Sequence, residues 1–233
     1  MKKFLTAALL LINFSANSQN NKWFVSVSTG YVFGGPGPSL KKQMSEKGFG
    51  DDKITYASFS NSSSKSSYPK KSTDGNFLIR GGKKMNDKRS LYFCIGKVNT
   101  EEVEGFKRID NTGALAGSVG QMAGIKYTIW QLTAGVMYSK NKKTKLALGP
   151  SAFIINYNLN SGDNQTKLIP GASFTGRFPL GKEKKPLGID FMIDINLAPP
   201  VKMDVKSPGI DAFQPGAANM IHGTLGFAIS LRE

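Results

Sequence analysis

The sequence of 233 residues contains one cysteine and one histidine, and each scarcity excludes a class of protein. A single cysteine cannot form an internal disulfide or a cysteine-rich metal site. A single histidine removes most zinc and iron sites, which use two or three histidine ligands. We therefore expect neither a metal nor a cofactor.

Long apolar runs are also missing, and acidic residues are outnumbered by basic ones. No run of about 18 apolar residues exists, which excludes a protein that crosses a membrane with helices. Lys and Arg number 31 against 16 Asp and Glu, a net charge of +15. The hydrophobic content of 39% is too high for a disordered chain. Composition alone thus describes one soluble basic domain, or two small ones, for which nucleic acid is the usual partner.

The first residues have the features of an export signal. Two lysines precede an apolar run at 4–14, and small residues follow at 16–18. This run is too short to span a membrane, and the small residues suit a cleavage site. We predict a cleaved signal peptide over 1–18 and a single exported domain over 19–233.

Beyond the signal, apolar residues recur at every second position. From Leu187 to Leu197, apolar side chains alternate with Gly188, Asp190, Met192, Asp194 and Asn196. A period of two is typical of a strand with one apolar face. The same test predicts eight strands, over 22–33, 75–84, 91–98, 127–138, 145–159, 168–180, 187–197 and 221–231. In the fifth, the phase slips near Gly149 and Pro150, which predicts a bulge.

The links between these strands alternate in length. Short links at 85–90, 139–144 and 181–185 are rich in turn-forming residues. Long links cover 34–74, 99–126, 160–167 and 198–217. Short turns at one rim, long loops at the other and an even number of strands are typical of an outer-membrane barrel.

Alternation does not say which face is inside, because a soluble lipocalin-type barrel also has eight strands. The charges well inside the strands decide between the two. They are Arg80, Arg177, Asp190 and Asp194, which balance one another on the face of small polar residues. This suits a crowded lumen better than a surface in water. Aromatic residues near strand ends fit the interfacial belts of a membrane barrel; they are Trp23, Tyr31, Trp130, Tyr138 and Tyr157.

With this pattern, the chain resembles the small eight-stranded outer-membrane barrels of Gram-negative bacteria, similar to the OmpA transmembrane domain, OmpX and OmpW. One local match lies in the last strand, where Thr224, Gly226, Ile229 and Leu231 resemble the signal read by the barrel-insertion machinery. The resemblance implies an all-β, eight-stranded antiparallel transmembrane barrel with periplasmic termini and turns and extracellular loops. It also implies the insertion machinery and outer-membrane lipids as partners.

The lumen of so small a barrel is expected to be filled by side chains. Pairing Phe178 with Ile189 across the 181–185 turn would place Arg177 beside Asp190, as an interior plug or, alternatively, a proton relay. We also expect Gln131, Asn156 and His222 to be polar lumen residues. His222 has no serine signature beside it, so we predict no catalytic residue. A lipid-modifying enzyme that uses His222 and a narrow conduit for small apolar molecules remain the alternatives.

Most of the excess positive charge falls in the short turns. The predicted basic rim comprises Lys84, Lys88, Arg89, Lys140, Lys142, Lys143, Lys182, Lys184 and Lys185. A ring of lysines at one end of a barrel can reach anionic lipid headgroups, and a periplasmic partner or the cell wall is the alternative. We expect no nucleic acid. The predicted function is that of a non-enzymatic outer-membrane protein, with a structural role or with binding of a surface ligand by the long loop 34–74.

Overall fold

The structure is a computed structural model of the chain. It describes residues 23–47, 49, 75–109, 119–141, 144–159, 164–180, 187–203 and 214–231. Within the strands, the side chains of 106–123, 140, 141 and 159 are not described. The predicted signal peptide lies outside the described residues, as does most of the first long link.

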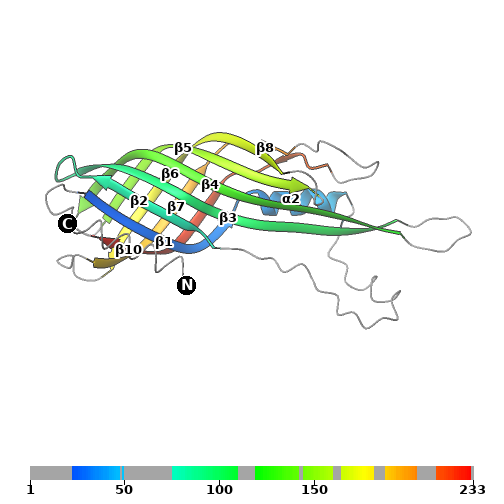
Figure 1. The fold of residues 1–233 in the computed structure, drawn as a ribbon, viewed down its shortest axis with the longest axis horizontal. Coiled ribbons are helices and arrows are strands. Elements are labelled where there is room, and N and C mark those ends of the chain that lie inside the picture. The colour runs from blue at the N-terminus through cyan, green and yellow to red at the C-terminus, as the bar shows by residue number, and fades with distance from the viewer. Residues whose placement is uncertain are drawn as a thin grey trace, which may run out of the picture.

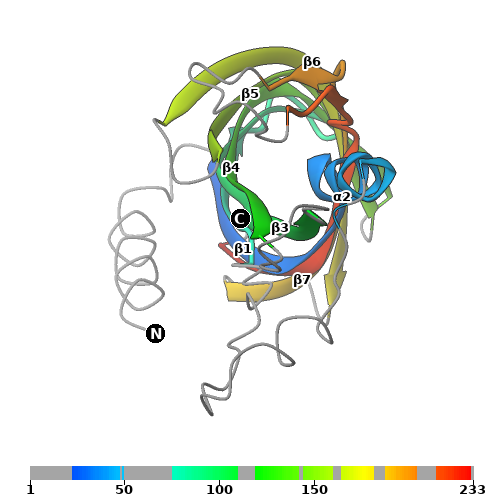
Figure 2. The ribbon, with the colours of Figure 1, turned by 90° about the vertical axis from the view of Figure 1, so that its right-hand side faces the viewer.

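The strands form one closed antiparallel barrel, in the order β1-β10-β7-β6-β5-β4-β3-β2 (Figures 1 and 2). The predicted eight-stranded antiparallel barrel is therefore confirmed. Closure comes from β1 and β10, which pair from Val25 with Leu231 to Gly34 with His222. The strands are β1 (Trp23–Gly34), β2 (Phe77–Lys83), β3 (Arg89–Ile109), β4 (Val119–Asn141), β5 (Thr144–Leu159), β6 (Gln165–Leu180), β7 (Leu187–Leu197) and β10 (His222–Leu231).

Two strands run far beyond the barrel. The link predicted at 99–126 is wrong, because β3 and β4 have 21 and 23 residues and pair through most of it. The register shifts once, between Lys97 and Asn99, and then continues from Asn99 with Ile129 to Ile109 with Val119. At 3.4 Å per residue this ribbon, 99–109 with 119–129, is about 34 Å long (Figure 1). The outward residues that the structure describes in its part nearest the barrel, Thr100, Glu102, Lys126 and Thr128, are polar, so the sequence test for an apolar face missed it.

The predicted loop 34–74 begins with a helix, α2 (Pro36–Glu46), that the sequence test also missed. Gly34 and Gly35 have φ values of 76° and 82°, which let the chain turn sharply out of β1. Pro36 then starts the helix, where a missing N–H costs nothing. Leu40 and Met44, one turn apart, are buried at the barrel mouth. A Gly-Pro-Gly-Pro stretch usually predicts an interruption of regular structure, but here it forms the N-cap and first turn of a helix.

The last long link also contains structure, since β8 (Val201–Lys202) and β9 (Ala217–Ala218) form a small separate sheet. This sheet and α2 lie at the mouth from which the ribbon projects (Figure 1). The short connections lie at the other end, where β1 begins and β10 ends. Among the described residues, no helix combines the length and hydropathy needed to cross a membrane.

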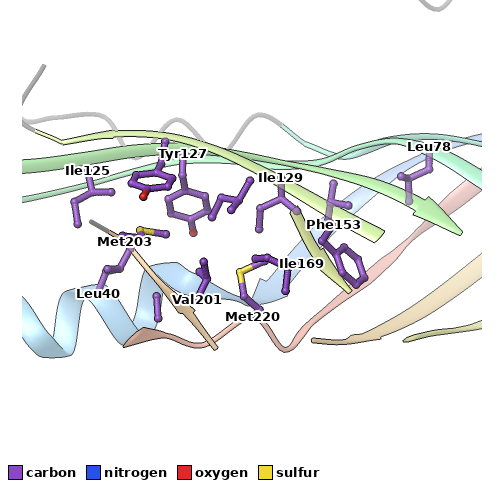
Figure 3. Close-up of a cluster of buried hydrophobic side chains, with 14 of the residues drawn as sticks. Leu40, Leu78, Ile125, Tyr127, Ile129, Phe153, Ile169, Val201, Met203 and Met220 are labelled. Carbon is purple, nitrogen blue, oxygen red and sulfur yellow. The ribbon is translucent and has the colours of Figure 1, made fainter. Parts of the chain in front are cut away.

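We call the barrel end beside α2 and the ribbon the upper end, and the end of the short turns the lower end. The interior of the upper half is apolar, which the sequence did not indicate. Figure 3 shows side chains from the strands, α2 and β8 pointing toward one another. We call this group the apolar cap. It consists of Leu40, Met44, Val98, Val103, Ile125, Tyr127, Ile129, Phe153, Ile155, Tyr157, Ile169, Val201, Met203, Ala218 and Met220, all buried.

The cap explains the apparent slip of phase in β5. The pairs of β5 with β6 run without a shift through Gly149 and Pro150, so the predicted bulge is wrong. Leu148 faces outward in the lower part of β5, with 59% of its surface exposed. Phe153, Ile155 and Tyr157 point into the cap instead. The apolar residues change faces along one regular strand, because the strand leaves the exposed apolar outer wall and enters a packed mouth.

Candidate functional site

The outer wall of the barrel is apolar between two charged ends. On β4, outward positions hold Tyr138, Leu132 and Trp130, and then Thr128 and Lys126. At the short-turn end, Lys83 lies 5.9 Å from the Trp23 ring centroid and Arg89 lies 5.5 Å from that of Tyr138. Between these ends, the outward positions of the described strands carry no charged side chain below the row of Trp130, where Lys97 stands opposite it on β3. We call this wall the apolar belt.

Four of the five predicted belt aromatics lie on this wall. Trp23, Tyr31, Trp130 and Tyr138 are all exposed. Tyr157 is not, because only 1% of its surface is exposed, and its prediction as a belt residue is wrong. It belongs to the apolar cap.

The lower lumen holds two buried ion pairs. Arg80 Nη2 lies 2.5 Å from Asp194 Oδ2, and both residues have 1% of their surface exposed. Thr175 and Thr224 also donate hydrogen bonds to the Asp194 carboxylate, and Arg80 donates to Ser28. Each charge is thus paired and hydrogen-bonded, which a buried charge needs.

The second pair forms in a register other than the predicted one. Arg177 Nε lies 2.6 Å from Asp190 Oδ2, so the expected contact is present. However, Phe178 pairs with Phe191 and not with Ile189, and Arg177 stands opposite Met192. The long arginine reaches its partner diagonally. Its guanidinium carbon also lies 5.5 Å from the Phe24 ring centroid, which packs the cation against an aromatic face.

Small polar side chains fill the lumen above these pairs. Gln131 Nε2 donates to Thr133 at 2.8 Å and to Ser173 at 3.0 Å. Ser173 in turn donates to Asn196 Oδ1 at 2.5 Å and lies 2.6 Å from Ser151 Oγ. Gln131 therefore occupies the lumen, and the network joins β4, β5, β6 and β7.

The other two predicted lumen residues differ in position. His222 is buried, with Nδ1 2.9 Å from the Met220 carbonyl oxygen and its ring edge-on to Phe153. Asn156 is not in the lumen, so that prediction is wrong. It lies on the same face of β5 as Ile154 and accepts a 2.7 Å hydrogen bond from Thr166 Oγ1. It marks the upper limit of the apolar belt.

A buried carboxylate holds the start of α2, and sequence reasoning missed it. Tyr127 OH donates to Glu101 Oε2 at 2.8 Å and accepts from the Gly37 backbone N–H at 2.9 Å. A Cβ on Gly37 would lie 2.5 Å from Glu101 Oε1, so any larger residue here would have to displace the Glu101 carboxylate. We call Gly37, Glu101 and Tyr127 the helix clamp. No signal could have found it, because Glu101 falls in a segment predicted as a loop.

Polar contacts also tie α2 to the last long link. Gln43 Nε2 donates to the Ala217 carbonyl at 2.9 Å, and the Gly216 N–H donates to Gln43 Oε1 at 2.6 Å. Lys47 Nζ donates to the Gln214 carbonyl at 3.0 Å. These hydrogen bonds thus hold α2 and the last long link together over the barrel mouth.

The residues of the predicted insertion signal lie on both faces of β10. Thr224 points into the lumen, while Ile229 and Leu231 face outward. A Cβ on Gly226 would lie 2.2 Å from the Thr29 carbonyl oxygen, so the closing strands approach too closely for a side chain.

The basic rim is described only in part. Lys84 Nζ lies 3.1 Å from Asp87 Oδ1, and the Lys88 N–H donates to Asn86 Oδ1 in the β2–β3 turn. Arg89 stands over Tyr138, as given above. The side chain of Lys140 and the whole of Lys142, Lys143, Lys182, Lys184 and Lys185 lie outside the description.

Buried side chains occupy the interior, so the surfaces that could contact other molecules lie on the outside of the barrel. Within the described ranges, no group of three His, Cys, Asp or Glu could hold a metal ion. Nor does a serine hydroxyl or carboxylate of those ranges hydrogen-bond to the His222 ring. The features left for contact with other molecules are the apolar belt, the ribbon and the outer surface of the cap.

Comparisons with known proteins found no matching protein-family model and no matching curated protein. Among solved structures, the chain is similar to Ail, the attachment invasion locus protein of Yersinia pestis, in complex with the heparin analogue sucrose octasulfate. That alignment has 10% identity and a TM-score of 0.38, and covers 90% of this chain and 99% of Ail. The chain is also similar to Neisserial surface protein A, with 10% identity, a TM-score of 0.40, and coverage of 91% and 97%.

Proposed function

We propose that the chain is an outer-membrane barrel with its short turns in the periplasm and its ribbon and cap outside the cell. The apolar belt supports this, because a wall of exposed apolar side chains is stable only against hydrocarbon. On β4 the belt runs from Tyr138 to Trp130, about the 9–11 tilted residues that cross a bilayer core. The lysines of the short turns would then lie at anionic lipid headgroups, with a periplasmic partner or the cell wall as the other occupant.

We infer that the protein presents surface segments to a ligand, and that it neither transports a solute nor catalyses a reaction. The observation that carries this is the filled interior: two ion pairs and a hydroxyl network below, and the apolar cap above. A conduit would need an open path through both layers. An enzyme that uses His222 would need a nucleophile or carboxylate at its ring. The ribbon, in contrast, continues past the last pair of β4 with β5, which is Ile125 with Leu159, as about 17 Å of paired backbone from Glu104 with Gly124 to Ile109 with Val119.

The proposed surface ligand therefore has two segments to bind. The predicted binding loop 34–74 is partly committed to the cap, because Leu40 and Met44 are buried. Binding would then fall to the ribbon or to residues 50–74. Thr224, Gly226, Ile229 and Leu231 keep their proposed role as the signal for the insertion machinery.

Two deletions and a control test this function. In one variant, 104–124 is replaced by an Asn-Gly turn, which keeps Val103 and Ile125 of the cap; in the second, 50–74 is shortened; in the control, 161–163 is shortened. Intact cells are treated with a membrane-impermeant crosslinker, and the adducts of each variant are compared. We expect adducts to disappear in one deletion while heat-modifiable migration, the mark of a folded barrel, persists. The same adducts in all variants would refute display by these segments, and recovery of the wild type outside the outer-membrane fraction would refute the location.

A further inference from the structure

The apolar belt contains a groove across four consecutive strands, β6, β7, β10 and β1. Its volume is about 470 Å³, within the range of pockets that hold small ligands. Its walls are Leu180, Ile189, Phe227 and Ile229, and Thr29 closes one end. Leu180, Ile189 and Phe227 are all well exposed.

The strand register explains why the groove exists. One outward row reads Phe178, Phe191, Phe227 and Thr29 across the four strands. The three rings follow one another with centroids 6.3 and 5.7 Å apart. The row then ends in a threonine where a fourth ring would stand. At the other outward belt positions of the described strands there is no Ser, Thr, Asn or Gln, so Thr29 is the one residue of these four types on this wall.

The row below is aliphatic and parallel to the first. It reads Leu180, Ile189, Ile229 and Val27 in the same strand order. Rows two residues apart on a strand are separated by about 6.8 Å throughout the belt, so this groove differs from the rest of the wall by the ring that is missing at Thr29. Since the groove opens in the lipid-facing wall, its surroundings are acyl chains and its occupant must be apolar.

We propose that this groove holds one acyl chain of a phospholipid of the periplasmic leaflet, more tightly than the rest of the belt holds lipid. Leu180 is the last residue of β6 and Ile189 the third of β7, so the groove lies toward the short-turn end. The gain over other lipid contacts is one of packing, because apolar surfaces in lipid attract each other only through van der Waals contact. The proposal rests on the membrane location proposed above.

Photolabelling of the full chain tests the groove. The protein is refolded into phosphatidylcholine vesicles that contain a diazirine-acyl phosphatidylcholine, irradiated and digested, and the labelled residues are mapped by mass spectrometry. We expect labelling of the groove residues to exceed that of the exposed Leu91 on β3 and Leu132 on β4, on the opposite wall, by about three-fold, a modest ratio because only packing distinguishes the sites. Equal labelling of both walls would overturn the proposal.

Matched variants separate the groove from its neighbours. Thr29→Phe completes the aromatic row and fills the groove, so its labelling should fall to the level of the opposite wall. Thr29→Val keeps the volume and should change nothing. Leu180→Trp narrows the other end and serves as the second test if Thr29→Phe does not insert. Unchanged labelling in an inserted filling variant refutes the groove, whereas a wild type that fails to insert into vesicles refutes the membrane location instead.

Discussion

Asp194 is the residue whose replacement tests the lumen most directly. Its carboxylate accepts from Arg80 at 2.5 Å, from Thr175 at 2.7 Å and from Thr224. Asp194→Asn keeps the shape of the side chain and removes the charge. The Arg80 guanidinium, with 1% of its residue exposed, would then remain charged in the barrel without a countercharge.

The expected loss of stability follows from this burial. Removing one partner of a buried ion pair costs about 3–5 kcal/mol, because the other charge stays buried and unpaired. We therefore expect Asp194→Asn to lower the free energy of unfolding by about 3 kcal/mol. Asp194→Ala should cost more, because Thr175 and Thr224 would lose their acceptor as well.

Urea unfolding in vesicles, followed by tryptophan fluorescence, measures the change. Arg80→Met with Asp194→Leu removes both charges, and should be more stable than the sum of the single changes predicts. Asp87→Asn is the control, because the Asp87 side chain is 97% exposed and its pair with Lys84 should contribute nothing measurable. If Asp194→Asn unfolds at the wild-type urea concentration, or if the double change costs the full sum, the lumen pair is not the structural plug described here.

Three further predictions concern the parts above the membrane. Gly37→Ala drives a Cβ into the Glu101 carboxylate, and should release α2 and make it sensitive to proteases while the barrel stays folded; an unchanged cleavage rate would contradict the helix clamp. Ile155→Ala leaves a cavity in the apolar cap and should lower the free energy of unfolding by about 2–5 kcal/mol, whereas a change below that range in urea unfolding would mean a loosely packed cap. Burial and the neighbouring Glu102 raise the pKa of Glu104 above its ordinary value, so protonation favours the folded ribbon; amide protection factors in the ribbon should rise as pH falls through that pKa, and Glu104→Gln should abolish this dependence.

Strands could be predicted accurately from the sequence wherever one whole face lies on the exposed apolar wall. The predicted strand 187–197 matches β7 residue for residue, because every outward position there is apolar and every inward one except Met192 is small or polar. Because the outward face of this strand is apolar along its whole length, local sequence is sufficient to predict the strand. The balance of Arg80, Arg177, Asp190 and Asp194 likewise indicated buried pairs before any partner was known.

The helix clamp, the ribbon and the true side of Asn156 could not be predicted in this way. Alternation with a period of two shows that the two faces of a strand differ, but it does not show which face points into the barrel. In β5 the register stays constant while the apolar residues move from the outward to the inward face. Glu101 and Tyr127 acquire their roles only because α2 folds back over the barrel mouth.

By itself, then, the sequence determined the class of fold, the number of strands and the apolar wall, since these follow from short-range periodicity. Only the tertiary structure decided what fills the barrel. Interior partners such as Arg80 and Asp194 are joined by contacts across 114 positions of the chain, and no local pattern encodes contacts of that range. The same holds for the groove beside Thr29, which exists because four strands align their rows.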